Sequence, residues 1–252
     1  MKTAVTRHPY LFSLLTVLAL FGLTFLSRTI LPSAVVGNVS GLSPGELSQP
    51  SGLGQVFKSV KTADNLFWAL SILLTISLFF YLHWWREAGF KVSRRRSWYL
   101  LLFPLAACAL ALSGGINLPP AGLLVSQFIV ILLAVFGEEV VFRGVLWRAL
   151  APAGPLRAAF VTSFLSGILQ LGRTLTDGPW LEAVYVTLLA FCGGFTWAAL
   201  RWRTGSIWPV FVVHVALVFA ASVALLGPGT YPLFLLLITV GFLIYGIFLL
   251  RS

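Results

Sequence analysis

Two adjacent glutamates and an arginine interrupt an otherwise apolar stretch of the chain. Residues 137–143 read GEEVVFR, so Glu138, Glu139 and Arg143 lie inside a run that is otherwise typical of lipid-embedded helix. An ionisable side chain in the middle of a membrane helix costs about 3 kcal/mol on insertion scales, and such residues usually mark function. Two neighbouring carboxylates do not both ionise without a compensating positive charge. These three residues are therefore the first candidates for a catalytic site.

Helical spacing gives the two carboxylates different expected partners. Residues four apart on a helix are neighbours, so Glu139 is expected to pair with Arg143. Glu138 is rotated by about 100° from Glu139 and is left with another partner or with none. An apolar cavity without a cation disfavours the charged form of a carboxylate, which suits a general base near neutral pH. The spacing therefore predicts that Glu138 is the working carboxylate and that the Glu139–Arg143 pair fixes its geometry.

The same charged residues also allow a purely structural interpretation. They could form a packing network, or their side chains could reach the cytoplasmic surface together with Arg148. At about 1.5 Å per residue, Glu138 lies roughly 28 Å along a helix that begins near residue 119, which is close to its cytoplasmic end. The interpretations differ in whether the carboxylates and Arg143 are buried.

The composition indicates a membrane protein. Of the 252 residues 59% are hydrophobic and 10% are charged, whereas about a quarter of the residues of a soluble domain are charged. Apolar runs of about 20 residues are long enough to cross a bilayer as helices. We therefore expect an all-α, polytopic transmembrane bundle. The net charge of +10 falls in short loops beside apolar runs, so we expect a lipid bilayer and no nucleic acid as partner.

The apolar runs predict about eight membrane spans, over residues 10–27, 67–85, 98–114, 119–149, 157–172, 180–200, 206–226 and 231–250. Lys and Arg residues gather in alternate connections, and the positive-inside rule places these connections and both termini in the cytoplasm. The segment 28–66 is rich in Gly, Ser and Pro and is predicted to be a flexible external loop. We expect a multi-pass protein of a prokaryotic plasma membrane.

Two motifs resemble the CAAX-prenyl-protease and bacteriocin-processing family of intramembrane peptidases, also called the Abi family. Glu138 to Arg143 fit its EExxxR motif, and the stretch RTGSIWP at 203–209, followed by His214, is similar to its last turn and helix. The resemblance covers about residues 98–226 and implies that this segment is the peptidase core. Residues 1–97 are then two N-terminal helices with the external loop, and residues 227–252 are a C-terminal helix.

The resemblance also implies roles for these residues. Glu138 is expected to activate a water molecule, Glu139 and Arg143 to support it, and His214 to stabilise the oxyanion. The chain would then be a CAAX-protease-like endopeptidase of the glutamate type. It would cleave a membrane-proximal peptide bond from the cytoplasmic side, in a membrane-associated protein or peptide.

Two positions depart from the family pattern. The FxxxH motif is expected at residues 166–170, where this chain has Ser166 and Gln170, and the asparagine of the last motif falls on Val218. Glutamine can orient a water molecule but cannot exchange a proton with it. Losing a positioned acid–base group typically costs about 10²–10⁴-fold in rate. The alternative is therefore a catalytically impaired member that acts as a membrane binding or chaperone protein.

Other site chemistries are less well supported. A catalytic zinc needs about three protein ligands, and the spans offer two glutamates and one histidine without an HExxH motif, so no cofactor is expected. Cys192 could form a thiol–histidine pair with His214, but free cysteines in helices are commonly small apolar fillers. We expect both Cys108 and Cys192 to be buried thiols. His214 could also be a buried polar side chain that a neighbour satisfies.

Overall fold

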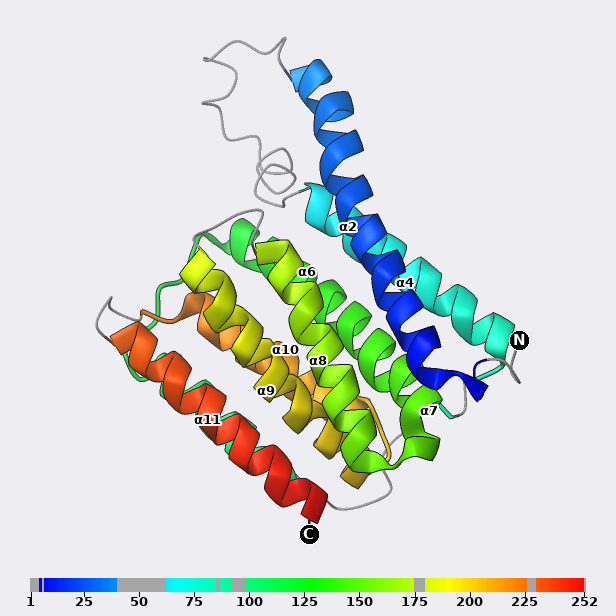
Figure 1. Ribbon diagram of the computed structural model, residues 1–252. Helices are drawn as coiled ribbons and strands as arrows, with labels where there is room; N and C mark the ends of the chain where they lie inside the picture. The colour runs from blue at the N-terminus through cyan, green and yellow to red at the C-terminus, as the bar shows by residue number, and fades with distance from the viewer. Residues whose placement is uncertain are drawn as a thin grey trace.

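The computed structural model describes residue 5 and residues 7–39, 62–84, 87–91, 98–174, 180–225 and 230–251. This part of the chain is a bundle of helices without a β-strand (Figure 1). The long helices are α2 (Pro9–Val39), α4 (Thr62–Leu82), α5 (Leu102–Leu112), α6 (Ala121–Glu139), α8 (Pro155–Thr174), α9 (Trp180–Thr204), α10 (Trp208–Val223) and α11 (Thr230–Arg251). Short helical turns precede α5 (Trp98–Leu101) and follow α6.

The predicted all-α membrane bundle of about eight helices is confirmed. Four segments are long and apolar enough to cross a membrane: Pro9–Leu26, Ala121–Ala153, Ala183–Thr204 and Leu233–Arg251. Three shorter apolar helices accompany them, over Ala69–Leu82, Tyr99–Leu112 and Trp208–Val223. The remaining predicted span, 157–172, corresponds to α8, which is more polar and buries Thr162, Ser163 and Ser166 within the bundle.

The predicted external loop 28–66 is too long at both ends. Helix α2 continues to Val39 and α4 begins at Thr62, so the loop can occupy at most residues 40–61, which lie outside the described residues. The arginine at position 28 ends the apolar run of the first span, but a charged side chain does not interrupt the backbone hydrogen bonds of a helix. The predicted boundary at residue 27 therefore marks the end of the apolar run and not the end of the helix, which continues to Val39.

The helix that carries the glutamates changes its winding next to them. Helix α6 ends at Glu139, and Val140–Leu146 follow as a π-helix, before the α-helical turn α7 (Trp147–Leu150) and a 3-10 turn (Ala151–Ala153). Short π-helical segments inside α-helices occur frequently at functional sites. Every residue from Glu139 to Trp147 is buried. Gly144 allows α4 to approach, since an added Cβ would lie 3.0 Å from Cζ of Phe79.

The RTGSIWP turn joins α9 to α10 and holds the segment 87–91 against the bundle. Gly205 has the left-handed φ of +68° that the turn requires. The Ile207 amide donates to the carbonyl of Gly89 at 2.9 Å, and Trp208 Nε1 donates to the carbonyl of Phe90 at 2.8 Å. The family-like turn therefore holds the segment 87–91 at the end of the bundle where α9 ends and α10 begins.

Candidate active site

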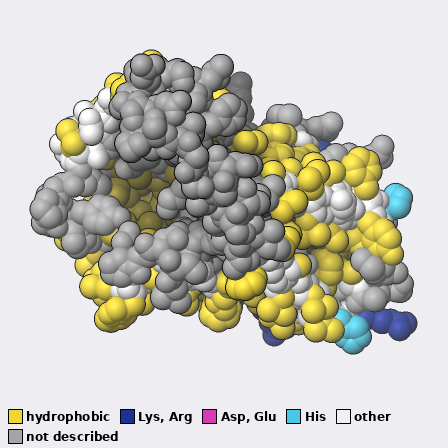
Figure 2. All heavy atoms as spheres, turned by 90° about the horizontal axis from the view of Figure 1, so that it is seen from above, with side chains coloured by type: hydrophobic (Ala, Val, Ile, Leu, Met, Phe, Trp, Pro, Cys, Tyr) yellow, Lys and Arg dark blue, Asp and Glu magenta, His cyan; other side chains and the backbone are white. Residues whose placement is uncertain are grey.

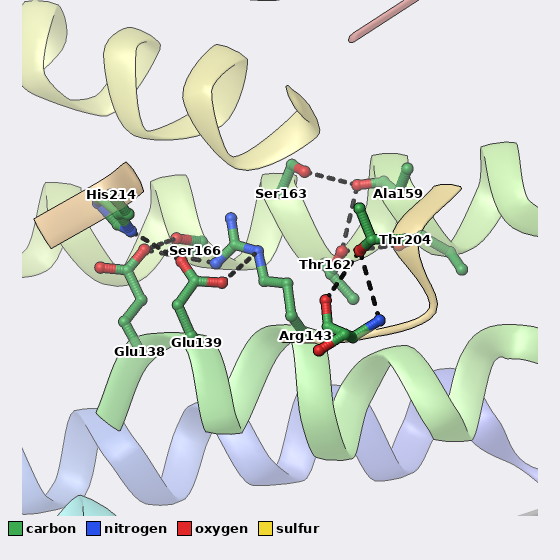
Figure 3. A network of polar contacts seen from close by, with 11 residues as sticks. Glu138, Glu139, Arg143, Ala159, Thr162, Ser163, Ser166, Thr204 and His214 are labelled. Carbon is green, nitrogen blue, oxygen red and sulfur yellow. Dashed lines mark hydrogen bonds and ion pairs between the residues drawn. The ribbon is translucent and has the colours of Figure 1, made fainter. Parts of the chain in front are cut away.

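Glu139, Arg143 and His214 meet in the interior of the bundle (Figure 3). The side chains of Glu139 and Arg143 are fully buried, with 0% exposed. His214 comes from α10, and its Nδ1 lies 2.8 Å from Oε1 of Glu139. This burial contradicts the interpretation that the charged side chains reach the cytoplasmic surface. A carboxylate and a guanidinium without access to water must instead compensate each other.

Arg143 serves both carboxylates rather than Glu139 alone. Its Nε lies 3.5 Å from Oε2 of Glu139, and its Nη1 lies 3.5 Å from Oε1 of Glu138. Of the two expectations for Glu138, another partner or none, the structure shows partners, and one of them is the same Arg143. The environment without a cation, from which its role as base was argued, is not the one that the structure shows. The planar guanidinium carries five N–H donors in a fork, so one side chain can face two neighbouring carboxylates. At 3.5 Å these contacts are ion pairs, and no closer hydrogen bond reaches the guanidinium from the described residues.

Glu138 differs from Glu139 in how much of its side chain is exposed. Its side chain is 23% exposed, whereas that of Glu139 is 0% exposed. The hydroxyl of Ser166 on α8 donates a hydrogen bond to Oε1 of Glu138 at 3.0 Å. This role of Ser166 was not predicted, because the serine stands where the family pattern has a phenylalanine. Its spacing of four from Gln170 was the available signal, since the two residues share one face of a helix.

A cavity of about 360 Å³ lies beside Glu138. Residues of α6, α8, α9, α10 and α11 line it, among them Glu138, Gln170, His214, Val218 and Trp197. The structure therefore brings Glu138, Gln170 and His214 to one space, with Glu139 and Arg143 buried behind them. Both positions that depart from the family pattern, 170 and 218, also face this cavity.

The ring of His214 is held on two sides. It stacks on Trp197 with ring centroids 5.2 Å apart and planes inclined by 26°, while its Nδ1 faces Glu139. When Nδ1 carries a proton toward an ionised Glu139, Nε2 remains for a ligand in the cavity. Nε2 has no hydrogen-bond partner among the described residues. Trp197 was missed from the sequence, because nothing in its spacing distinguished it from the other aromatic residues of the spans.

The two glycines after Cys192 have different functions. A Cβ at Gly194 would lie 2.9 Å from Nη2 of Arg143 and 3.3 Å from Cβ of Ser163, so this glycine makes room for the guanidinium. A Cβ at Gly193 would meet only ordinary contacts, of which the nearest is 3.6 Å from Nε1 of Trp197.

Both cysteines are free and buried, as predicted. Cys192 packs in an apolar cluster with Cys108, and it is not among the described residues that line the cavity. The thiol–histidine interpretation therefore has no geometric support. Among the described residues, no group of three or more His, Cys, Asp or Glu side chains could hold a metal ion. Catalysis without a metal stays a prediction.

A family comparison agrees with this arrangement. Residues 120–220 match the family model described as "Type II CAAX prenyl endopeptidase Rce1-like". The matched segment includes the EExxxR motif, Gln170 and His214, and it lies inside the 98–226 core that the motifs indicated. No curated protein and no solved structure matches the chain. Residues 120–220 are therefore similar to the Rce1-like family of type II CAAX prenyl endopeptidases.

Proposed function

We propose that the chain is a CAAX-protease-like intramembrane endopeptidase of the glutamate type, with Glu138 as the general base. One observation carries this assignment: Glu138 is the only acidic side chain among the described residues that line the cavity, and His214 lines the same space. The similarity of residues 120–220 to a family of CAAX prenyl endopeptidases supports the reaction class. The substrate is then a membrane-associated protein or peptide. The Lys and Arg distribution supports cytoplasmic termini, and the membrane in this proposal is a prokaryotic plasma membrane.

The reaction follows from the positions around the cavity. Glu138 takes a proton from a water molecule that the amide of Gln170 orients, and the resulting hydroxide adds to the peptide carbonyl carbon. The carbonyl oxygen gains the negative charge, and an Nε2–H of His214 donates a hydrogen bond to it. Glu138 then returns its proton to the leaving amine as the C–N bond breaks. Gln170 carries no proton in this scheme, so Glu138 alone performs the proton transfers.

Glu139 and Arg143 act on the reaction through their neighbours. Glu139 orients the His214 ring through Nδ1 at 2.8 Å, as a carboxylate orients the histidine of a catalytic triad. Arg143 compensates the charge of Glu139 and contacts Glu138 at 3.5 Å. Both are therefore positioning residues in this proposal.

The test is cleavage of a membrane-tethered reporter by the wild type and by Glu138→Gln. The expected loss is about 10²–10⁴-fold, because glutamine keeps the shape of the side chain but cannot take a proton. Glu87→Gln is the matched control, since Glu87 is exposed and lies outside the cavity lining. Equal cleavage by Glu138→Gln and Glu87→Gln would show that Glu138 is not the base.

A catalytically impaired membrane binding or chaperone protein is the second candidate. It is favoured by the positions of Gln170 and Val218, which both line the cavity where the family pattern has a histidine and an asparagine. This candidate predicts that Glu138→Gln leaves the cellular role intact, and that Gln170→His combined with Val218→Asn creates cleavage where the wild type has none. Loss of the cellular role in Glu138→Gln at normal protein level would contradict it.

A further inference from the structure

The indole of Trp197 is part of the cavity wall next to His214. Trp197 is the last residue of α9 in the cavity lining, and it is 3% exposed. Its ring packs against two others, with ring centroids 5.2 Å from His214 and 5.0 Å from Phe242 of α11. These contacts hold the indole in one orientation, so the direction of its N–H is fixed before a ligand enters.

The N–H of this indole faces the cavity. A Cβ at Gly193 would lie 3.6 Å from Nε1 of Trp197, and Gly193 itself lines the cavity. Side chains on a helix lean toward its N-terminus, which for Trp197 is the direction of the other lining residues of α9. Because position 193 has no side chain, nothing from its own helix covers the N–H at this point.

Nε1 of Trp197 is a donor without an acceptor. It has no hydrogen-bond partner among the described residues, and it is not sealed by packing as the guanidinium nitrogens of Arg143 are. The N–H of a buried tryptophan usually finds a partner. An open N–H in the wall of a cavity therefore marks a place where a ligand can supply the acceptor.

The surroundings make such a donor effective. Apolar side chains form most of the cavity wall. Hydrophobic side chains also dominate the described part of the face shown in Figure 2, where no acidic side chain is visible. A fixed donor stabilises a developing charge more strongly where little water competes with it.

The proposed reaction has one donor fewer than the family pattern. His214 supplies one hydrogen bond to the carbonyl oxygen, but Val218 stands where the pattern has an asparagine, and valine has no N–H in its side chain. The donor of His214 also depends on which ring nitrogen carries the proton. An indole N–H is a donor only, and it does not change with pH.

We infer that Nε1–H of Trp197 is the second hydrogen-bond donor to the oxyanion, in place of the amide that position 218 lacks. The inference rests on the proposed function for the reaction that forms this oxyanion. The indole keeps its proton throughout, so the bond changes of the proposed reaction stay the same. Trp197 is then a catalytic residue, and Gly193 is a positioning residue that leaves its N–H uncovered.

The kinetic test is Trp197→Phe, which keeps an aromatic ring against His214 and Phe242 but removes the N–H. We expect kcat for the tethered reporter to fall about 10²–10³-fold, with little change in KM, because the bond forms only in the transition state. Trp202→Phe is the matched control, since Trp202 lies on the same helix, is 50% exposed and is outside the cavity lining. Equal kcat values for the two variants overturn the inference.

A second variant keeps the indole in place. Gly193→Ala puts a methyl group 3.6 Å from Nε1, so it should lower kcat at least 10-fold without lowering the thermal aggregation temperature. Adding Val218→Asn to Trp197→Phe returns an amide donor to the cavity wall and should recover at least 10-fold of the lost kcat.

A binding measurement tests the N–H without requiring activity. The probe is a capped dileucine phosphinate, whose anionic tetrahedral oxygens stand in for the oxyanion, and the protein carries Glu138→Gln so that no carboxylate of the cavity wall repels it. The nine tryptophans are labelled with ¹⁵N, and the indole signal of Trp197 is identified by its absence after Trp197→Phe. We expect this signal to move downfield on addition of the probe, further than any other indole signal.

The inference is overturned if the Trp197 signal stays in place up to the solubility limit of the probe. If the signal moves but the wild type cleaves no reporter, the anion-binding N–H stands and the proposed activity fails. If the wild type cleaves, Glu138→Gln does not, and Trp197→Phe matches Trp202→Phe, the proposed function stands and the inference on Trp197 fails.

Discussion

Two halves of the bundle differ in packing although the same helices build both. The open half lies between the carboxylates and the connection 113–120, and the closed half lies between the carboxylates and the turn that joins α9 to α10. Helix α6 buries only Ser126 and Ile131 among residues 121–134, whereas the chain that continues it buries every residue from 139 to 147. Helix α9 shows the same contrast: Ala183 is its only buried residue among the described side chains before residue 192, and residues 192–201 are all buried. Glu138 and Glu139 lie where the loosely packed stretch of α6 meets the densely packed stretch that continues it.

This position gives each charged residue a different environment. Arg143 and Glu139 belong to the closed half, where dense packing excludes water and holds their geometry. Glu138 and His214 border the open half, with side chains that are 23% and 12% exposed. A peptidase needs both conditions, since water must enter to react while the groups that orient it must not move. The contrast between the halves therefore predicts which substitutions affect folding and which affect only the cavity.

The largest effect on folding is expected for Arg143→Ala. Removing the guanidinium leaves two carboxylates together without their cation, and breaking a buried pair in this way costs about 3–5 kcal/mol. Glu138→Gln should cost much less, because it replaces one hydrogen-bonding group by another of nearly equal shape. Arg143→Lys should be intermediate, since lysine keeps the charge but loses the planar fork. The measurement is extracted yield and thermal aggregation temperature in detergent.

If Arg143→Ala is as stable as Glu138→Gln, the pair contributes little to the closed half. The carboxylates would then be better described as groups that reach water, and the contrast between the halves would lose its main electrostatic element.

A matched pair of leucines tests the packing contrast directly. Leu200 in the closed half is 0% exposed, whereas Leu217 lines the cavity. Leu200→Ala should lower the free energy of unfolding by about 2–5 kcal/mol, because it opens a new cavity in dense packing. Leu217→Ala enlarges a space that already exists and should cost less than about half of that. Unfolding in mixed detergent micelles measures both, and equal losses would contradict the difference in packing.

Adjacent glycines provide a finer test on one helix. Gly194→Ala places a Cβ 2.9 Å from Nη2 of Arg143, and such overpacking typically costs about 1–3 kcal/mol. Gly193→Ala makes only ordinary contacts and gains up to about 1 kcal/mol of helix propensity. We expect opposite signs for the two changes in unfolding free energy. A stable Gly194→Ala would mean that the guanidinium has room to shift.

The helices and the functional cluster were predictable for different reasons. Apolar runs mark membrane helices strongly, so all eight expected spans correspond to helices in the structure, with the first extended to Val39. The grouping of Glu138, Glu139 and Arg143 followed from spacing within one helix. The contributions of Ser166 and Trp197 did not, because they depend on how α8 and α9 are rotated toward α6. The shared use of Arg143 was also hidden, since spacing gives neighbours along a helix but not the reach of a forked side chain.

The smallest effect is expected from metal chelators. Glu139 is engaged by Nδ1 of His214 at 2.8 Å and by Arg143 at 3.5 Å, and the same guanidinium lies 3.5 Å from Glu138. A fixed positive charge between the two carboxylates repels a divalent cation and occupies the lone pairs that would bind it. A zinc site with three protein ligands would have to displace Arg143. Cleavage of the tethered reporter should therefore be unchanged after dialysis against phenanthroline or EDTA. A loss of activity that added zinc restores would show that the carboxylates bind metal in the working enzyme, and that Arg143 moves away to admit it.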